Sequence, residues 1–187
     1  KYAWAMPSFH CGSGVPLFEE WKAVCALVFA GPEDIASGPS PAYTLLGGDI
    51  PGIQDFVYTV ASAGAARGLR GRSFFVQLVG DAVIQRLLSE LGLSIANIVY
   101  AAGGNFMLLA PALENPIAGR SVGDILQKLS AEVETVLLKH FEGDLSVCLA
   151  WKPVKLQQIF SREFAETCSR EVKASIAAAK QQRFGHI

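Results

Sequence analysis

The sequence lacks an excess of charge of either sign. Its 187 residues carry 16 Lys and Arg against 17 Asp and Glu, which leaves a formal net charge of −1. Proteins that follow a nucleic-acid backbone usually show a clear basic excess, because they neutralise phosphates with Lys and Arg. Composition alone therefore gives no indication of direct nucleic-acid binding.

Long hydrophobic runs and paired cysteines are also missing. Gly, Gln or charged residues interrupt every apolar stretch well before the about 18 residues that a membrane span needs. The four cysteines are far apart, none forms a C-x-x-C pair, and no signal peptide opens the chain. We therefore expect no membrane association, reduced thiols and a cytoplasmic location. The first residue is Lys1 rather than Met, so we also expect a piece of a longer protein.

Several motifs of catalysis and metal binding are absent as well. The sequence contains no G-x-x-x-x-G-K-[ST] phosphate loop and no nucleophile elbow. The three histidines, His10, His140 and His186, share no spacing that suits a metal ion. For these histidines we expect structural or surface roles.

The residues that are present suit one compact domain with an appended helical segment. Hydrophobic residues make up 51% of the chain and charged residues 18%, which is ample for a buried core. Apolar periodicity and turn residues predict the following elements. The first part has a helix at 16–30 with an apolar stripe, a linker at 31–41, a strand at 43–49, helical residues at 53–66 and a basic turn at 67–72. A helix at 73–91 with Ser73 as N-cap follows, and then strands at 97–102 and 105–110. The last part has a helix at 121–141 capped by Ser121, a strand at 145–151, and from 161 a polar-faced helix that leaves the domain.

This order of elements indicates the fold class. Strand, helix, strand, strand, helix, strand is the ferredoxin-like βαββαβ pattern of α+β proteins. Its crossover rule puts both helices on one face of a four-stranded antiparallel sheet. We expect a linker helix segment at 1–42, a palm-like ferredoxin domain at 43–155 and a C-terminal helical extension at 156–187. Polymerase and cyclase palms share this topology, although topology alone does not give function.

The string Gly47-Gly48-Asp49 resembles the metal-binding motif of such palms. An active palm needs two carboxylates at one end of the sheet, because two Mg²⁺ ions about 3.5–4 Å apart must be held there. Asp49 ends the first predicted strand and is a candidate metal ligand. The hairpin position that should carry the second acid is Asn105, and its amide brings no charge. We expect Asp49 and Asn105 to lie side by side as half of a site.

The turn after Asp49 is a second candidate for ligand contact. A helix that begins at or near Pro51, beside the bare backbone of Gly52, offers unpaired N–H groups to a phosphate or a base edge. The alternative is a tight strand-to-helix turn in which Asp49 or Asp55 merely caps the helix.

The basic turn at 67–72 is a third candidate. Arg70 and Arg72 suit planar, bidentate contacts with a triphosphate or RNA. The alternative is a solvated turn, or ion pairs with Asp55 or Asp81.

Two longer strings carry a family resemblance. GGDIPGIQDFVYTVASAGAARGLRGRSFFVQLV (47–79) is followed by NIVYAAGGNFMLLAP (97–111). Together they resemble the first palm domain of the large signature subunit of type III CRISPR–Cas effector complexes, the Csm/Cmr large subunit. That family's pattern runs G-D-I-S-G-I-Q-x-F-I-Y, then L-R-G-R-S-F, then G-G-G-x-F. Residues 1–42 resemble, less strongly, the segment that links the family's HD domain to this palm.

The resemblance implies a role in antiviral defence. In the family, two palms face each other across a cleft that converts ATP to cyclic oligoadenylates when a guide RNA pairs with a target RNA, and an HD domain cuts single-stranded DNA. The second palm carries the catalytic G-G-D-D, so this first palm would be non-catalytic, with little or no activity alone. The resemblance implies ATP and Mg²⁺ in the intact subunit, with the second palm and other effector subunits as direct partners and the two RNAs as indirect ones. The ATP-binding positions implied are Asp49, Ile50, Pro51, Gly52, Ile53, Gln54, Gly103, Gly104 and Asn105.

The sequence also departs from the family. It contains no His-Asp dipeptide and no G-G-D-D, and Pro51 stands where the family has a small hydroxyl residue that a base edge could contact. Two other interpretations therefore stay open. One is an inert interaction scaffold, and the other is a degenerate cyclase-like regulatory domain that acts as a homodimer.

Overall fold

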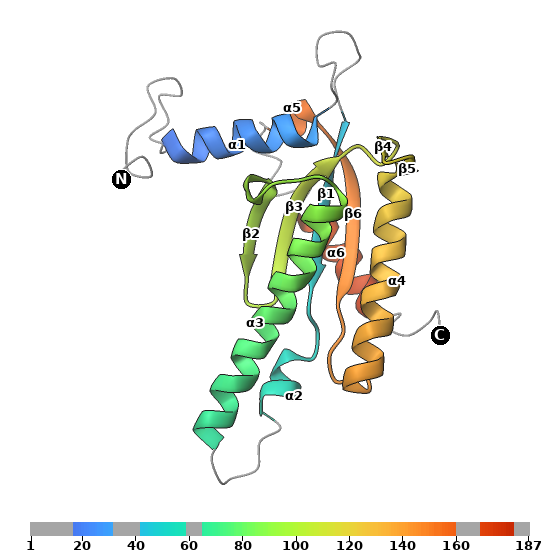
Figure 1. The fold of residues 1–187 in the computed structure, drawn as a ribbon. Helices are drawn as coiled ribbons and strands as arrows, with labels where there is room; N and C mark the ends of the chain where they lie inside the picture. Colours follow the sequence, from blue (N-terminus) through green and yellow to red (C-terminus); the bar gives the residue numbers. More distant parts are fainter. Residues whose placement is uncertain (1–16, 32–41, 59–64, 160–168, 182–187) are drawn as a thin grey trace.

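An antiparallel sheet forms the centre of the protein (Figure 1). The structure is a computed structural model that describes residues 17–31, 42–58, 65–159 and 169–181. The sheet has four strands in the order β2-β3-β1-β6. Their bounds are β1 Ala42–Asp49, β2 Ile98–Ala102, β3 Asn105–Pro111 and β6 Cys148–Lys155. The first three agree with the predicted strands to within one residue at each end.

Two long helices cover one face of this sheet. α3 spans Ala65–Glu90 and α4 spans Val122–Phe141. Their apolar side chains form a common core with Leu46, Phe106 and Leu108, which share one face because side chains alternate along a strand. The element order and the shared face confirm the ferredoxin-like α+β fold predicted from the sequence.

The opposite face of the sheet is covered as well, by α1 and α6. α1 spans Leu17–Ala30 and α6 spans Ser169–Gln181. Both belong to a second core cluster with Tyr43, Leu45 and Met107. The prediction that the C-terminal helix leaves the domain is therefore wrong for α6, which packs Val172 and Ile176 against the sheet. An apolar second face explains this packing, since its strand residues would otherwise meet water.

A buried asparagine fixes α1 to the domain. Asn97 ends the short helix η2, Ile95–Asn97, and is fully buried. Its amide nitrogen donates to the Ala26 carbonyl of α1 at 2.9 Å and to the Leu109 carbonyl of β3 at 3.0 Å. Its amide oxygen accepts from the Ser94 backbone. All these groups are satisfied, as buried polar groups require.

The apolar stripe predicted for the first helix does not face the protein. Trp21, Val24 and Val28 are 66%, 59% and 61% exposed, whereas Ala26 and Ala30 on the other side are buried. Small side chains let α1 approach the domain closely, and this decides which side of the helix packs. The apolar stripe is left as an open surface.

The basic segment at 67–72 is not a turn but part of α3. Two glycines in a helix cost about 1 kcal/mol each relative to Ala. The packing of Leu69 against the core and of Arg72 against α2 offsets that cost. Ser73 is consequently a mid-helix residue, and its predicted N-cap role is wrong. Of the helix predicted at 53–66, α2 covers Ile53–Tyr58, and residues 59–64 lie outside the described part.

The other predicted boundaries differ less. Ser121 caps α4 as expected, accepting a hydrogen bond from the Asp124 N–H at 3.1 Å. The last strand begins at Cys148 rather than 145, because β1 ends at Asp49, the residue that pairs with Cys148. The small elements β4 Pro116–Ile117, β5 Arg120–Ser121 and α5 Leu156–Ile159 were not predicted. Among the described residues, none of the helices combines the length and apolar character that crossing a membrane requires.

Candidate functional site

The end of β1 and the β2–β3 hairpin meet at one end of the sheet. Asp49 and Asn105 are register partners in the β1–β3 ladder, so the two side chains lie side by side on the same face, as predicted. That face is the one covered by α6. Asp49 is 5% exposed, and its carboxylate lies 2.5 Å from the Lys180 ammonium of α6.

The double glycine before Asp49 has a packing role. A Cβ at Gly48 would overlap the ring of Phe106, and a Cβ at Gly47 would lie 3.0 Å or less from Val172 and Ile176 of α6. Both positions need glycine because the sheet is closely covered on both faces here. The two glycines that resemble a catalytic motif therefore allow β1 to pack closely against Phe106 on one face and α6 on the other.

The turn from β1 to α2 is tied to the hairpin. The Ile50 N–H donates to the Gly104 carbonyl at 2.9 Å, and Ile53 packs over Gly104, which has a φ of +84°. Gly52 has a φ of +85°, and a Cβ there would lie 2.7 Å from the Asp144 carbonyl. The turn is thus held in one position, and one of the N–H groups considered for a ligand is already paired.

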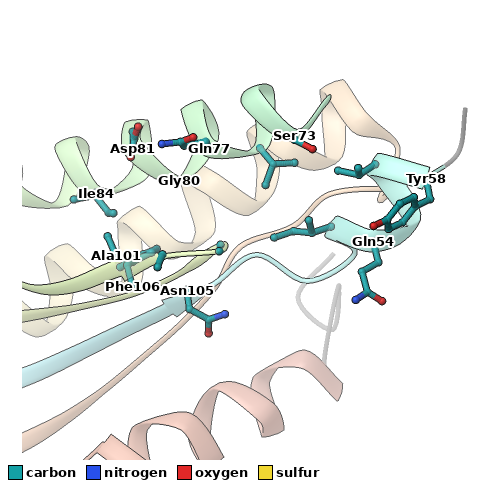
Figure 2. A pocket seen from close by; sticks show the side chains of 16 residues that line it. Gln54, Tyr58, Ser73, Gln77, Gly80, Asp81, Ile84, Ala101, Asn105 and Phe106 are labelled. Atoms are coloured by element: carbon teal, nitrogen blue, oxygen red, sulfur yellow. The ribbon is translucent and has the colours of Figure 1, made fainter. Parts of the chain in front are cut away.

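A cavity of about 460 Å³ opens between α2, α3 and the hairpin (Figure 2). Its size falls in the range of small-molecule sites. Apolar side chains of both helices and β3 form part of its wall, among them Ile53, Val76 and Phe106. The polar residues of its lining are Gln54, Tyr58, Ser73, Gln77, Asp81 and Asn105. In Figure 2 the side chains of Gln54 and Asn105 point away from α3.

The residues proposed from the sequence divide into two groups. Ile53, Gln54, Gly103, Gly104 and Asn105 line the cavity. The other four, Asp49, Ile50, Pro51 and Gly52, are not among its lining residues. The turn therefore acts as a support of the cavity wall, through the bond from Ile50 to the hairpin.

Of the two arginines singled out from the sequence, Arg72 is engaged inside the protein. Its guanidinium donates to the Phe56 carbonyl at 2.6 Å and lies 5.2 Å from the centroid of the Phe56 ring. Phe56 packs in turn against Phe75 and Phe141. Arg72 thus joins α2 to α3. Arg70 is exposed on α3, and the contact of either arginine with phosphate or RNA stays a prediction.

Further polar residues gather around Asp49 on the α6 face. The Lys173 ammonium lies 5.9 Å from the centroid of the Tyr100 ring. Burial, and secondly the nearby Asp49 charge, raise the pKa of the Tyr100 hydroxyl, which therefore stays protonated near neutral pH. In the part of the chain that the structure describes, no three His, Cys, Asp or Glu residues form a group able to hold a metal ion.

A family model described as Csm1 subunit domain B matches residues 42–186. The chain belongs to this family. A Cas10/Csm1 protein from Thermococcus onnurineus, described as a CRISPR system single-strand-specific deoxyribonuclease of subtype III-A, is 34% identical over 190 residues. That alignment covers 94% of this chain and 23% of the relative. The Mycobacterium tuberculosis protein of the same description is 34% identical over 155 residues, which cover 76% of this chain and 18% of the relative.

Solved structures of Csm1 agree with this membership. The Csm1–Csm4 cassette in complex with cA3 is 31% identical, with a TM-score of 0.77 over 93% of this chain and 24% of that chain. The cassette in complex with AMPPNP gives the same values. The chain thus carries the palm domain of Cas10/Csm1, the large subunit of type III CRISPR systems, and spans about a quarter of the length of these relatives.

Sequence reasoning missed the α3 side of this Csm1 domain B cavity. Ser73, Gln77 and Asp81 recur every four residues and therefore share one side of α3, where all three line the cavity. The spacing was visible in the sequence. The helix start predicted at Ser73 assigned that residue a capping role, and nothing in the sequence showed that the side of the helix with Gln77 and Asp81 faces a cavity.

Proposed function

We propose that the chain is the non-catalytic first palm of a type III CRISPR large subunit and binds ATP in the cavity between α2, α3 and the hairpin. In the intact protein it would form one wall of a cleft in which a second palm makes cyclic oligoadenylates. The observation that carries the proposal is the cavity itself, which combines apolar walls with a row of hydrogen-bonding side chains.

The chemistry of the lining supports a nucleobase as the occupant. The cavity is open, and the apolar lining residues Ile53, Val76 and Phe106 lie beside polar groups on one side of α3. The Asp81 carboxylate accepts hydrogen bonds, while the Gln77 amide and the Ser73 hydroxyl both donate and accept. This combination matches the amine and ring nitrogens on the edge of adenine.

The related structures point to the same ligand class. Csm1–Csm4 cassettes have been solved with AMPPNP, with one ATP, with pppApA and pppApApA, and with cA3 and cA4. These complexes concern the relatives, which are 30–34% identical to this chain. They support ATP as the nucleotide and an adenylate as the product of the whole protein.

The non-catalytic role is supported by the residues at the hairpin. Asn105 stands beside Asp49 where an active palm needs a second acid, and Lys180 already pairs with that carboxylate. These residues do not fit a two-metal centre, which needs two carboxylates at this end of the sheet. Magnesium bound with ATP in the intact subunit, with Asp49 as a ligand, stays a prediction.

The proposed partners follow from the same family. We expect the second palm of the same subunit to close the cleft, and other effector subunits, such as the Csm4 of the related cassettes, to bind this chain. Guide and target RNA would act indirectly, through the assembled complex.

Filling the cavity tests the proposal. Gly80 lines it from α3, and a Cβ there would lie 3.5 Å from Ile50, an ordinary contact. We expect Gly80→Leu in the full-length protein to remove about one bound ATP per molecule in calorimetric titration, since the side chain would enter the cavity. Gly71→Leu is the matched control, because it adds the same side chain to the same helix where nothing lies within 4 Å.

The result that contradicts the proposal is equal ATP binding by the two variants. In that case the scaffold interpretation is favoured, and the exposed apolar stripe of α1, with Trp21, Val24 and Val28, is the surface that supports it. A homodimer of this chain in solution, without ATP binding, would favour the degenerate cyclase-like alternative.

A further inference from the structure

A second group of polar side chains lies on the α6 face of the sheet, outside the cavity wall on α3. Asp49 of β1, Tyr100 of β2, Asn105 of β3 and two lysines of α6 are its members. They come from three neighbouring strands and one helix, and all lie at the hairpin end. We call this group the α6 cluster.

The ion pair at the centre of the α6 cluster holds a lysine in place. Asp49 is 5% exposed and bonded to Lys180, whose side chain is 39% exposed. An ammonium has three N–H donors, so one contact with a carboxylate leaves two for another acceptor. The buried carboxylate thus fixes the position of a half-exposed ammonium that keeps N–H donors for another acceptor.

The neighbours of Lys180 add to this charge and bring further donors. Lys173 lies near the ring of Tyr100, and burial keeps the Tyr100 hydroxyl protonated. Asn105 is exposed on the same face and contributes an amide. Two ammonium groups against one carboxylate give these residues a surplus of one positive charge.

The α6 cluster is adjacent to the cavity. Asn105 lines the cavity, and its side chain in Figure 2 points away from α3 and toward α6. A ligand whose base lies between α3 and the hairpin can therefore extend a charged tail around the hairpin toward Lys180. An ammonium attracts phosphate as a point charge.

We propose that the α6 cluster binds the phosphate groups of the nucleotide, with Lys180, oriented by Asp49, as the principal contact and Lys173 as a second one. This inference rests on the proposed function, because it concerns the tail of the same ligand.

A photolabelling competition measures this site alone. The full-length protein is labelled with 2-azidoadenosine, and the yield on peptides that contain residues 73–81 and 101–106 is followed while ATP or adenosine competes. We expect ATP to compete at about tenfold lower concentration than adenosine, since charge-assisted contacts add to the binding of the base. We expect this advantage to persist within about twofold in EDTA, because the positive charge is on the chain.

Variants then assign the advantage to the lysines. Lys180→Met should reduce it to about threefold or less while leaving competition by adenosine unchanged. Lys173→Met, which leaves the ion pair intact, should reduce it in part, and Lys180→Arg should retain it. Lys128→Met is the control, since Lys128 is an exposed lysine on α4, on the other side of the sheet.

The outcomes separate the two proposals. Labelling with an ATP advantage that Lys180→Met and Lys173→Met both leave intact, or that disappears in EDTA, overturns the phosphate site and leaves the base cavity standing. Absence of any specific label on the cavity peptides overturns the proposed function, and the phosphate site with it.

Discussion

At the scale of single residues, the glycines before Asp49 show how a motif can be reused. Gly48 has no room for a side chain, because the ring of Phe106 lies where its Cβ would be. Gly47 is similarly enclosed by Val172 and Ile176 of α6. The sequence therefore keeps the appearance of a metal-binding motif for reasons of packing. Its acid is retained too, with a lysine as its partner.

Gly48→Ala tests this packing role. Overpacking a close-packed interior costs about 1–3 kcal/mol, so we expect the free energy of unfolding to fall by about that amount in urea or thermal unfolding. Gly71→Ala should be neutral or gain up to about 1 kcal/mol, because that position is open and helical. The double variant Gly48→Ala/Phe106→Leu should recover part of the loss. Equal stabilities of Gly48→Ala and the parent would contradict the account of the motif.

At the same scale, the sequence predicted that Asp49 lies beside Asn105, but not that Lys180 pairs with Asp49. Asp49 is the last residue of β1 and Asn105 the first residue of β3, so antiparallel pairing of these two strands brings the two positions together. Lys180 is distant in the sequence, in a segment that was expected to leave the domain. No local pattern indicates which acid a remote lysine will meet.

At the scale of elements, the helices differ in how well the side that packs against the protein could be predicted. α4 was predicted closely, because its cap at Ser121 and its strong apolar periodicity agree. α1 was predicted as a helix with an apolar stripe, but Ala26 and Ala30, rather than that stripe, face the protein. Periodicity identifies an amphipathic helix, whereas close approach to a neighbour depends on side-chain size.

The docking of α1 depends on Asn97. Truncation by Asn97→Ala would leave the buried carbonyls of Ala26 and Leu109 without this donor. An unsatisfied buried polar group costs about 1–3 kcal/mol, so we expect a loss of stability in that range. We also expect faster amide hydrogen exchange along α1, measured by mass spectrometry, with α4 unchanged. Gln127→Ala, which truncates an exposed amide on α4, is the control.

Protection of α1 that is unaffected by Asn97→Ala would contradict the docking role of Asn97. The helix would then be held by the contacts of Ala26 and Ala30 alone.

At the scale of the whole molecule, the sheet lies between two layers of helices (Figure 1). One layer, α3 and α4, follows from the order of elements and was predictable. The other, α1 and α6, comes from residues at either end of the chain and was not. Its presence changes the chemistry of the site, because α6 brings Lys180 to Asp49 of β1 and Lys173 to Tyr100 of β2.

The candidate site was predictable to a similar extent. The hairpin residues Gly103 to Asn105 and the helix residues Ile53 and Gln54 were expected to meet a nucleotide, and they line the cavity. The α3 residues that complete it, Ser73, Gln77 and Asp81, lay within the helix predicted at 73–91, but no signal in the sequence showed that this side of the helix faces the hairpin.

The central claim is that a nucleotide binds between α3 and the hairpin with its phosphates toward α6. A structure of the full-length protein determined with a non-hydrolysable ATP analogue tests it most directly. We predict that the base lies against Ile53 and Phe106 beside Gln77, and that the nearest ammonium to the phosphates is that of Lys180. An analogue bound with its base away from this cavity, or no analogue bound by this chain, would contradict the claim.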